Sequence, residues 1–136
     1  MAFWNLFYHV IWATRDRAPL LMPEVERVAL GAIERKSNAL QCPIHAINGA
    51  GDHVHVAVSI PPKIAVADWV RQIKGVSSRE VNAAFPDLEI AFAWQNSYGV
   101  LSFGVKHLPI VTAYIVNQKA HHADHQLVDY LERLED

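Results

Sequence analysis

Two histidines separated by a single residue are the side chains best suited to chemistry in this sequence of 136 residues. His53 and His55 alternate with Val54, Val56 and Val58. In a β-strand this alternation places the valines on one face and both imidazoles on the other, about 7 Å apart. The pair could share a metal ion, but two imidazoles leave an ion under-coordinated, so a third ligand must come from elsewhere. The alternative is a pair of partly exposed histidines on a half-buried strand.

The same stretch argues against one known use of alternating histidines. Nucleotide hydrolases of the histidine-triad type carry a third histidine as the nucleophile. In this sequence the third place is taken by Ala57. The residues needed for that chemistry are therefore incomplete.

A second group of polar side chains lies near the end of the sequence. Tyr114 and Gln118 are four residues apart, which is one helical turn, so both emerge on the same stripe of a helix. His121 extends that stripe and Asn117 adjoins it. The amide oxygen of Gln118 is a neutral ligand suited to a hard ion such as Mg²⁺ or Mn²⁺. The alternative is a solvated helix face with a surface tyrosine.

Together the two groups predict phosphoryl-transfer chemistry. Two imidazoles and one amide oxygen leave coordination positions open for phosphate oxygens, and Tyr114 would place its hydroxyl beside that phosphate. A phenol with a pKa near 10 is a poor nucleophile at neutral pH, and a nearby cation stabilises the phenolate. Attack on a phosphodiester would give a phosphotyrosine that stores the bond energy. No nucleotide cofactor is then needed to rejoin strands.

The elements that must position these residues follow from hydrophobic periodicity and turn signals. The first six elements of the chain are expected in the order βαββαβ. This order predicts an α+β fold of the ferredoxin-like or RRM-like type. Helices would cover one face of an antiparallel sheet, leave the other face free for a partner, and be followed by a C-terminal helix that carries the tyrosine. The expected strands are 3–13, 43–47, 52–60, 90–94 and 98–105; the expected turn is 48–51; the expected helices are 23–40, 65–84 and 109–134.

Length and composition limit the class of protein. A chain of this size has room for one domain, here residues 1–136. Its single cysteine, Cys42, cannot form an internal disulfide, which favours a cytoplasmic location. No window approaches the roughly 20 apolar residues of a membrane span, and we expect no membrane association. The net charge of −2 neither supports nor excludes a phosphate-binding face.

Five motifs in order along the chain resemble the single-tyrosine HUH transposases (TnpA type) of the smallest bacterial insertion sequences. The likeness covers nearly the whole chain. The motifs are residues 9–14, residues 51–55, residues 74–79, Trp94-Gln95 with Tyr98-Gly99, and residues 114–118 with His121-His122. A lone His-hydrophobic-His motif is weak evidence for the family, whereas five motifs in the family's order are strong evidence.

The resemblance implies a specific activity. Members of the family bind single-stranded DNA hairpins at the element ends and cut with the tyrosine, leaving a 5′-phosphotyrosine and a free 3′-OH. His53, His55 and Gln118 match the family's metal ligands, and Tyr114 matches its nucleophile. Members of the family are homodimers, and the helix that carries the tyrosine commonly completes the active site of the other subunit.

Polar residues of the predicted second helix are candidates for binding DNA phosphates. Trp94 and Tyr98 are candidates to stack on bases. A solvated helix face explains the polar residues equally well. Two rival functions remain, a domesticated strand transferase that acts on repeats and a non-catalytic RRM-like module that binds single strands. The candidate DNA-binding residues are Arg71, Lys74, Ser77, Ser78 and Arg79.

Overall fold

The computed structural model describes residues 3–121, and the predicted continuation of the last helix, with His122, lies outside that range. A four-stranded antiparallel sheet of order β2-β3-β1-β4 forms its centre. This order, with the succession βαββαβ, is the predicted ferredoxin-like arrangement. The strands are β1 (Phe7–Ala13), β2 (Ile44–Gly49), β3 (His53–Ser59) and β4 (Gly99–Phe103).

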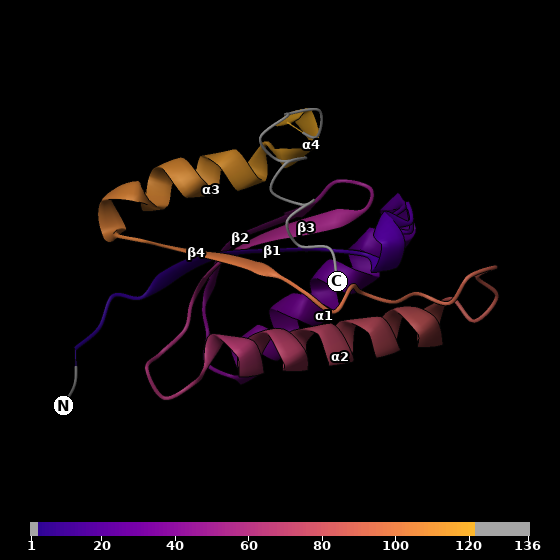
Figure 1. Cartoon of the computed structure of the whole chain (residues 1–136), viewed down its shortest axis with the longest axis horizontal. Helices are drawn as coiled ribbons and strands as arrows, with labels where there is room; N and C mark the ends of the chain where they lie inside the picture. Colours follow the sequence, from indigo (N-terminus) through magenta and orange to yellow (C-terminus); the bar gives the residue numbers. More distant parts are fainter. Residues whose placement is uncertain (1–2, 122–136) are drawn as a thin grey trace.

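Helices lie on both faces of the sheet, in layers that Figure 1 shows clearly. Two long helices, α1 (Pro23–Ala39) and α2 (Val66–Ala84), cover one face, as predicted. The helix α3 (Leu108–Val116) covers the other face and is followed by the short α4 (Gln118–His121). The second face is therefore partly occupied by the chain itself, and the prediction of a free face is wrong. Single 3₁₀ turns, η1 (Arg15–Arg17) and η2 (Val105–His107), complete the elements.

The hydrophobic core lies between the sheet and the pair α1 and α2. Val54, Val56 and Val58 of β3 are fully buried there, together with Val10 and Trp12 of β1. The predicted alternation in β3 is thus confirmed. Its second face is also buried, because α3 packs on it: Ile115 contacts a small apolar cluster that includes Ala46 and Ala57.

The predicted strands 90–94 and 98–105 are not two strands. Trp94 forms an isolated antiparallel bridge with Thr14, and Gly99 pairs with Ile11. Both segments therefore lie along the same edge of β1, as one edge strand that is interrupted at residues 95–98. The prediction of five strands was wrong because it treated the break as a turn between separate strands.

A side chain of α2 anchors the first half of this interrupted strand. Asn82 Nδ2 donates to the carbonyl oxygen of Phe92 at 2.9 Å, and the Phe92 N–H donates to Asn82 Oδ1 at 2.8 Å. The amide thus acts as a neighbouring strand would, which explains why residues 92–95 stay in line with β1 without regular pairing.

Another boundary differs at the end of β2. Asn48 and Gly49, which were predicted to form a turn, are the last two residues of the strand. The turn lies one step later, where the N–H of Ala50 donates to the carbonyl of His53 and Gly51 has a φ of 75°. Among the helices of residues 3–121, none is long and apolar enough to cross a bilayer.

The anchoring by Asn82 can be tested by its removal. Asn82→Ala leaves the Phe92 N–H and C=O without their partners, and we expect it to lower the free energy of unfolding by about 1–3 kcal/mol in urea denaturation. Asn38→Ala, at an exposed position of α1, is the matched control and should change it by less than about 0.5 kcal/mol. Equal losses in the two variants would contradict this role.

Candidate metal and tyrosine site

The two histidines of β3 lie on the sheet face that α3 covers. In the register of the sheet His53 pairs with Ala13 and His55 with Ile11. Both side chains are buried, with 3% and 1% of their residue surfaces exposed, and their ring centroids are 5.3 Å apart. The alternative of partly exposed histidines on a half-buried strand is therefore wrong.

Gln118 is fully buried on the same side of the molecule. Within residues 3–121, the buried side-chain nitrogen and oxygen atoms that have no hydrogen-bond partner are Trp12 Nε1, His53 Nε2, His55 Nε2 and both amide atoms of Gln118. Three of these residues are the predicted metal ligands. Buried polar atoms are almost always paired in proteins, so unpaired ones call for an explanation, and a bound ion is one.

The donor types fit a metal site. Among the described residues, no three His, Cys, Asp or Glu side chains are grouped so that they could hold an ion. Gln118 is an amide and is not counted among those side chains, but its buried and unpaired Oε1 is a further oxygen of ligand type. A site made of imidazole nitrogens and a neutral oxygen would bind Mg²⁺ or Mn²⁺ more weakly than a site made of carboxylates. Such a site leaves coordination positions open for substrate oxygens.

Each imidazole has a partner on its far nitrogen. Asp52 Oδ1 lies 2.7 Å from Nδ1 of His53, and His9 Nε2 lies 2.7 Å from Nδ1 of His55. A partner that accepts a proton from Nδ1 leaves the lone pair on Nε2, which is the atom that faces no other group. The Asp52 carboxylate accepts from Nδ1 of His53 and so leaves the lone pair of that ring on Nε2; in the contact between His9 and His55 either ring can be the donor, and His55 presents a lone pair at Nε2 when it is the one that donates.

His9 is a functional residue that the sequence analysis missed. It stands on β1 next to Val10 and two positions from Ile11, so alternation places it on the face opposite the core. That pattern and the place of His9 at the start of the motif 9–14 were its signals, but the sequence analysis gave it no role. The contact with His55 depends on how β1 and β3 align, which is a tertiary property.

Burial keeps the central rings neutral. It lowers the pKa of His9 to about 4. The pKa of His55 falls to about 2, chiefly because of burial and further because of repulsion from His9 and His53. Both rings are thus uncharged at neutral pH, as a ring nitrogen must be to bind a cation.

Tyr114 lies beside these rings within the same chain. Its ring centroid is 5.9 Å from that of His55 and 6.2 Å from that of His9, in edge-to-face orientations. Ile115, the next residue, is fully buried against the sheet and fixes the rotation of α3. The structure therefore brings together three of the four residues that the sequence singled out, Tyr114, His53 and His55, while Gln118 is a fully buried residue at the start of α4.

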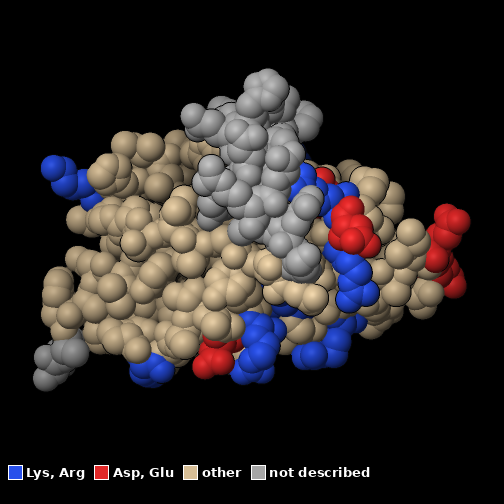
Figure 2. Space-filling view, in the orientation of Figure 1, with Lys and Arg blue, Asp and Glu red and all other residues tan. Residues whose placement is uncertain are grey.

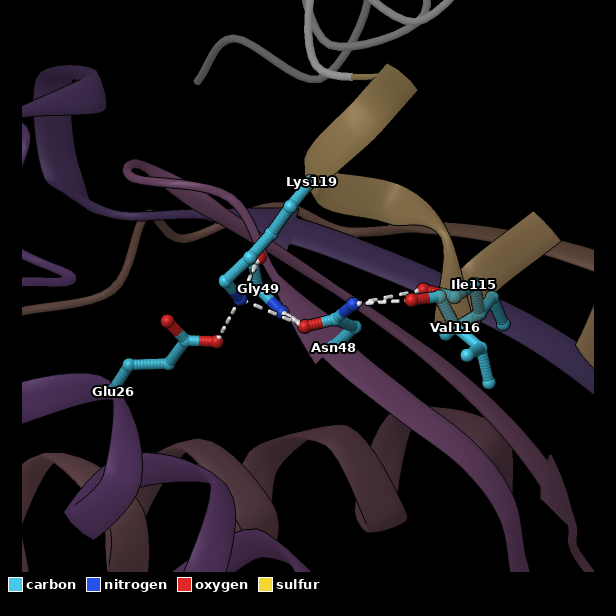
Figure 3. Close-up of polar contacts among 6 residues, drawn as sticks. All are labelled: Glu26, Asn48, Gly49, Ile115, Val116 and Lys119. Atoms are coloured by element: carbon cyan, nitrogen blue, oxygen red, sulfur yellow. Dashed lines mark hydrogen bonds and ion pairs between the residues drawn. The ribbon is translucent and has the colours of Figure 1, made fainter. Parts of the chain in front are cut away.

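The predicted single helix through Tyr114 and Gln118 is interrupted at Asn117, which has φ −94° and ψ 18°. Asn48 of β2 explains the break (Figure 3). Its Nδ2 donates to the carbonyl oxygens of Ile115 at 3.2 Å and Val116 at 3.0 Å, the groups that a continuing helix would bond to its own N–H groups. The chain changes direction there, and Gln118 lies in the buried position described above.

A separate cleft of about 370 Å³ lies between α2 and residues 92–98. Figure 2 shows Lys and Arg side chains gathered on the α2 side of the molecule, whereas the face over α3 is largely uncharged. The polar and aromatic residues that line the cleft are Arg15, Arg71, Lys74, Ser78, Phe92, Trp94, Gln95, Asn96 and Tyr98. Cations and aromatic rings on one concave surface suit a single-stranded nucleic acid.

The five candidate DNA-binding residues separate into groups. Arg71 and Ser78 line the cleft, and Lys74 lines it while donating to the carbonyls of Gln95 and Ser97, at 2.7 and 2.8 Å. Arg79 is exposed on α2 and is not among the residues that line the cleft.

Ser77 requires a correction. It is fully buried, donates its hydroxyl to the Ile73 carbonyl at 2.7 Å, and accepts the indole N–H of Trp94 at 2.8 Å. From this position it cannot contact DNA. The sequence analysis had grouped it with Ser78 as a polar residue of the same helix, although its side chain faces the core. We assign it instead to holding Trp94, one wall of the cleft.

Comparisons with known proteins agree with this geometry. Residues 2–118 match a family model described as IS200-like transposase. The transposase for insertion sequence element IS200 of Salmonella typhimurium is 31% identical over 120 residues, which cover 85% of this chain and 78% of that protein. The ISDra2 transposase TnpA of Deinococcus radiodurans is 27% identical over 119 residues, 85% of each chain.

Solved structures are similar as well. The crystal structure of a proposed transposase from Deinococcus radiodurans aligns with a TM-score of 0.71 and 28% identity, over 87% of this chain and 95% of that one. A REP-associated tyrosine transposase bound to a REP hairpin aligns with a TM-score of 0.65 over 90% of this chain and 74% of that chain. Because its sequence identity is only 17%, this second similarity is evidence for the fold alone.

The reassignment of Ser77 predicts a loss of stability rather than of DNA binding. Ser77→Ala leaves the buried Trp94 N–H unpaired, and we expect a loss of about 1–3 kcal/mol in the free energy of unfolding. Ser78→Ala removes the neighbouring, half-buried hydroxyl and serves as the control, with a change below about 0.5 kcal/mol. A Ser77→Ala protein of unchanged stability that binds DNA hairpins more weakly would contradict the reassignment.

Proposed function

This chain belongs to the IS200-like transposase family, and from that premise we propose that it cleaves and rejoins single-stranded DNA at hairpin-bearing ends through a phosphotyrosine on Tyr114. One observation carries the proposal. The Tyr114 ring lies 5.9 Å from the ring of His55, whose Nε2 is one of three buried and unpaired atoms of ligand type. This proximity of a phenol to an imidazole with a free nitrogen supports Tyr114 as the nucleophile beside a metal site in the same chain.

In the proposed cleavage step, the Oη of Tyr114 attacks the scissile phosphorus. A new bond forms between phosphorus and Oη while the bond from phosphorus to the 3′ oxygen breaks. The phenol proton passes to solvent, and the leaving oxygen gains a proton, so the products are a 5′-phosphotyrosine and a free 3′-OH. Attack by another 3′-OH on the phosphotyrosine reverses these steps and rejoins a strand, without a nucleotide cofactor.

His53, His55 and Gln118 are the residues that would hold a divalent ion, Mg²⁺ or Mn²⁺, through the unpaired Nε2 and Oε1 atoms. When bound, such an ion supplies positive charge that favours phenolate and offsets the charge of the phosphate in the transition state. Asp52 would accept the Nδ1 proton of His53, and His9 would accept that of His55 in the tautomer that frees Nε2 for the ion. The packing of Ile115 orients α3 and hence Tyr114.

The proposed DNA-binding surface includes the cleft beside α2. Arg71 and Arg15 offer charge to backbone phosphates, and the ring of Tyr98 offers a surface for stacking. Lys74 shapes the wall through its bonds to the 95–97 segment. A solved relative of the same fold is described as bound to a REP hairpin, which supports a hairpin as the ligand.

We also propose that the protein acts as a homodimer, as one domain and in the cytoplasm. Within residues 3–121, β4 is an edge strand of the sheet, hydrogen-bonded to β1 alone. Large apolar side chains are exposed along it and just beyond: Leu101 by 54%, Val105 by 56% and Ile110 by 66%. An exposed apolar edge strand is a favourable surface for a second copy of the same chain.

The nucleophile can be tested by trapping the covalent product. With Mn²⁺ and a single-stranded hairpin substrate, we expect the wild-type protein to form a DNA adduct, seen as a band shift under denaturing conditions and as added mass on Tyr114. Tyr114→Phe should lose the adduct entirely, because no oxygen remains to attack, while its affinity for the hairpin stays within about twofold.

Tyr98→Phe, which removes a phenol in the cleft, is the matched control and should retain the adduct. An adduct that survives in Tyr114→Phe would reject this nucleophile. No adduct in wild type at any metal concentration would favour the non-catalytic binding module.

The cleft can be tested with two arginines of the same helix. Arg71→Ala should weaken binding of a single-stranded hairpin, and should lower the dependence of log K on log salt by roughly 0.7 for the lost phosphate contact. Arg79→Ala removes an exposed charge outside the cleft lining and should have the smaller effect. Fluorescence anisotropy across a salt series measures both. A larger effect of Arg79→Ala would place the DNA path elsewhere on α2.

A further inference from the structure

A compact group of polar residues connects α4 to the opposite side of the sheet. Lys119 Nζ donates to Glu26 Oε1 at 2.7 Å, to Asn48 Oδ1 at 2.9 Å and to the carbonyl of Gly49 at 2.9 Å (Figure 3). Three acceptors match the three protons of an ammonium group. We call Glu26, Asn48, Gly49 and Lys119 the Lys119 clasp.

The clasp runs around the edge of the sheet. Glu26 belongs to α1, which covers one face, whereas Lys119 belongs to α4 on the side of α3 (Figure 1). Between them lies the end of β2, an edge strand. The ion pair therefore joins two layers that share no hydrophobic core at this point.

The pair is partly desolvated, which distinguishes it from an ordinary surface ion pair. The Glu26 side chain is only 12% exposed, although that of Lys119 is 61% exposed. Exposed pairs contribute little because water and salt screen them, and removing one partner of a buried pair leaves a charge without compensation. Glu26 without Lys119 would be such a charge.

Gly49 leaves the space that the carboxylate occupies. A Cβ built at this position would lie 3.1 Å from Glu26 Oε1 and 3.3 Å from its Cδ. Any side chain here would displace the carboxylate or the strand. The glycine therefore gives a way to disturb the clasp without touching either charge.

The clasp is connected to both parts of the proposed active site. Lys119 directly follows Gln118, so fixing Lys119 limits where the Gln118 amide can lie. Asn48 Oδ1 accepts from Lys119, while its Nδ2 holds the last carbonyls of α3, the helix of Tyr114. Asn48 also pairs with His55 across the two strands.

We propose that the Lys119 clasp positions Gln118 and the tyrosine helix against the histidine pair, with Glu26 and Lys119 as positioning residues for the reaction. The inference rests on the proposed function. It adds that a carboxylate on the far side of the sheet, remote from the phosphate, sets the geometry of the third ligand. Residues that orient ligands to a metal typically change affinity or activity by roughly 10–100-fold when they are replaced.

The experiment compares Glu26→Gln and Lys119→Met with Glu80→Gln. The control removes a carboxylate from the ion pair between Arg35 of α1 and Glu80 of α2, the two helices on the opposite face of the sheet from α3. Three quantities are measured for each protein: Mn²⁺ affinity by calorimetry without DNA, the single-turnover cleavage rate with hairpin affinity, and hydrogen exchange of the amides of α3 and α4.

We expect the two clasp variants to bind Mn²⁺ roughly tenfold more weakly, to cleave at least tenfold more slowly at saturating DNA, and to exchange the α3 and α4 amides faster. Hairpin affinity should stay within about twofold, because the cleft is elsewhere. Lys119→Arg keeps a donor group for the same acceptors and should recover most of the loss. Gly49→Ala should reproduce the effect of Glu26→Gln.

Clasp variants that match Glu80→Gln in Mn²⁺ affinity and in hydrogen exchange would overturn the inference. So would a loss of exchange protection spread evenly over all helices, because that pattern marks a structural role alone. A wild-type protein that neither binds Mn²⁺ nor forms an adduct would instead reject the proposed function. In that case the exchange of α3 and α4 still decides whether the clasp holds them.

Discussion

The structure depends on one constraint: the buried Nε2 atoms of His53 and His55 and the buried side-chain amide of Gln118 have no hydrogen-bond partner. Leaving a buried polar atom unpaired costs about 1–3 kcal/mol. The stability of a whole domain is only about 5–15 kcal/mol, so the unpaired atoms of His53, His55 and Gln118 consume a large part of it. Packing in the rest of the core must offset this loss of folding free energy. A cation bound by the unpaired atoms would reduce the loss.

The rest of the fold supplies that strength. The face of β3 that carries Val54, Val56 and Val58 packs against α1 and α2 and forms the main core. The opposite face carries the histidines and is closed by α3. Because alternate residues of one strand serve the core and the site, the valines hold the imidazoles at fixed positions. Asn48 then ends the tyrosine helix where Gln118 must turn inward.

Much of this arrangement was predictable from the sequence. The alternation in β3 predicted which face the histidines take. The order of the first elements predicted the ferredoxin-like topology. In each case a local pattern dictates the outcome, because periodicity in a strand or helix fixes direction without reference to distant residues.

The remainder depends on contacts between distant segments. His9 contacts His55 because the register of β1 and β3 brings the two rings together. The sequence around Asn48 is typical of a turn, and its role in ending α3 appears only when the helix packs beside it. Ser77 and Ser78 look alike in sequence, yet the rotation of α2 buries the first against Trp94. Residues 90–94 have the composition of a separate strand, but in the structure Trp94 pairs with Thr14 beyond the end of β1, on the same edge as β4.

The most direct test of the central claim is anomalous diffraction from a crystal of this protein soaked in Mn²⁺. The account predicts a single strong peak at about 2.0–2.3 Å from His53 Nε2, His55 Nε2 and Gln118 Oε1 together. At saturating Mn²⁺, a peak elsewhere, or no peak while the three side chains keep their present positions, would contradict it.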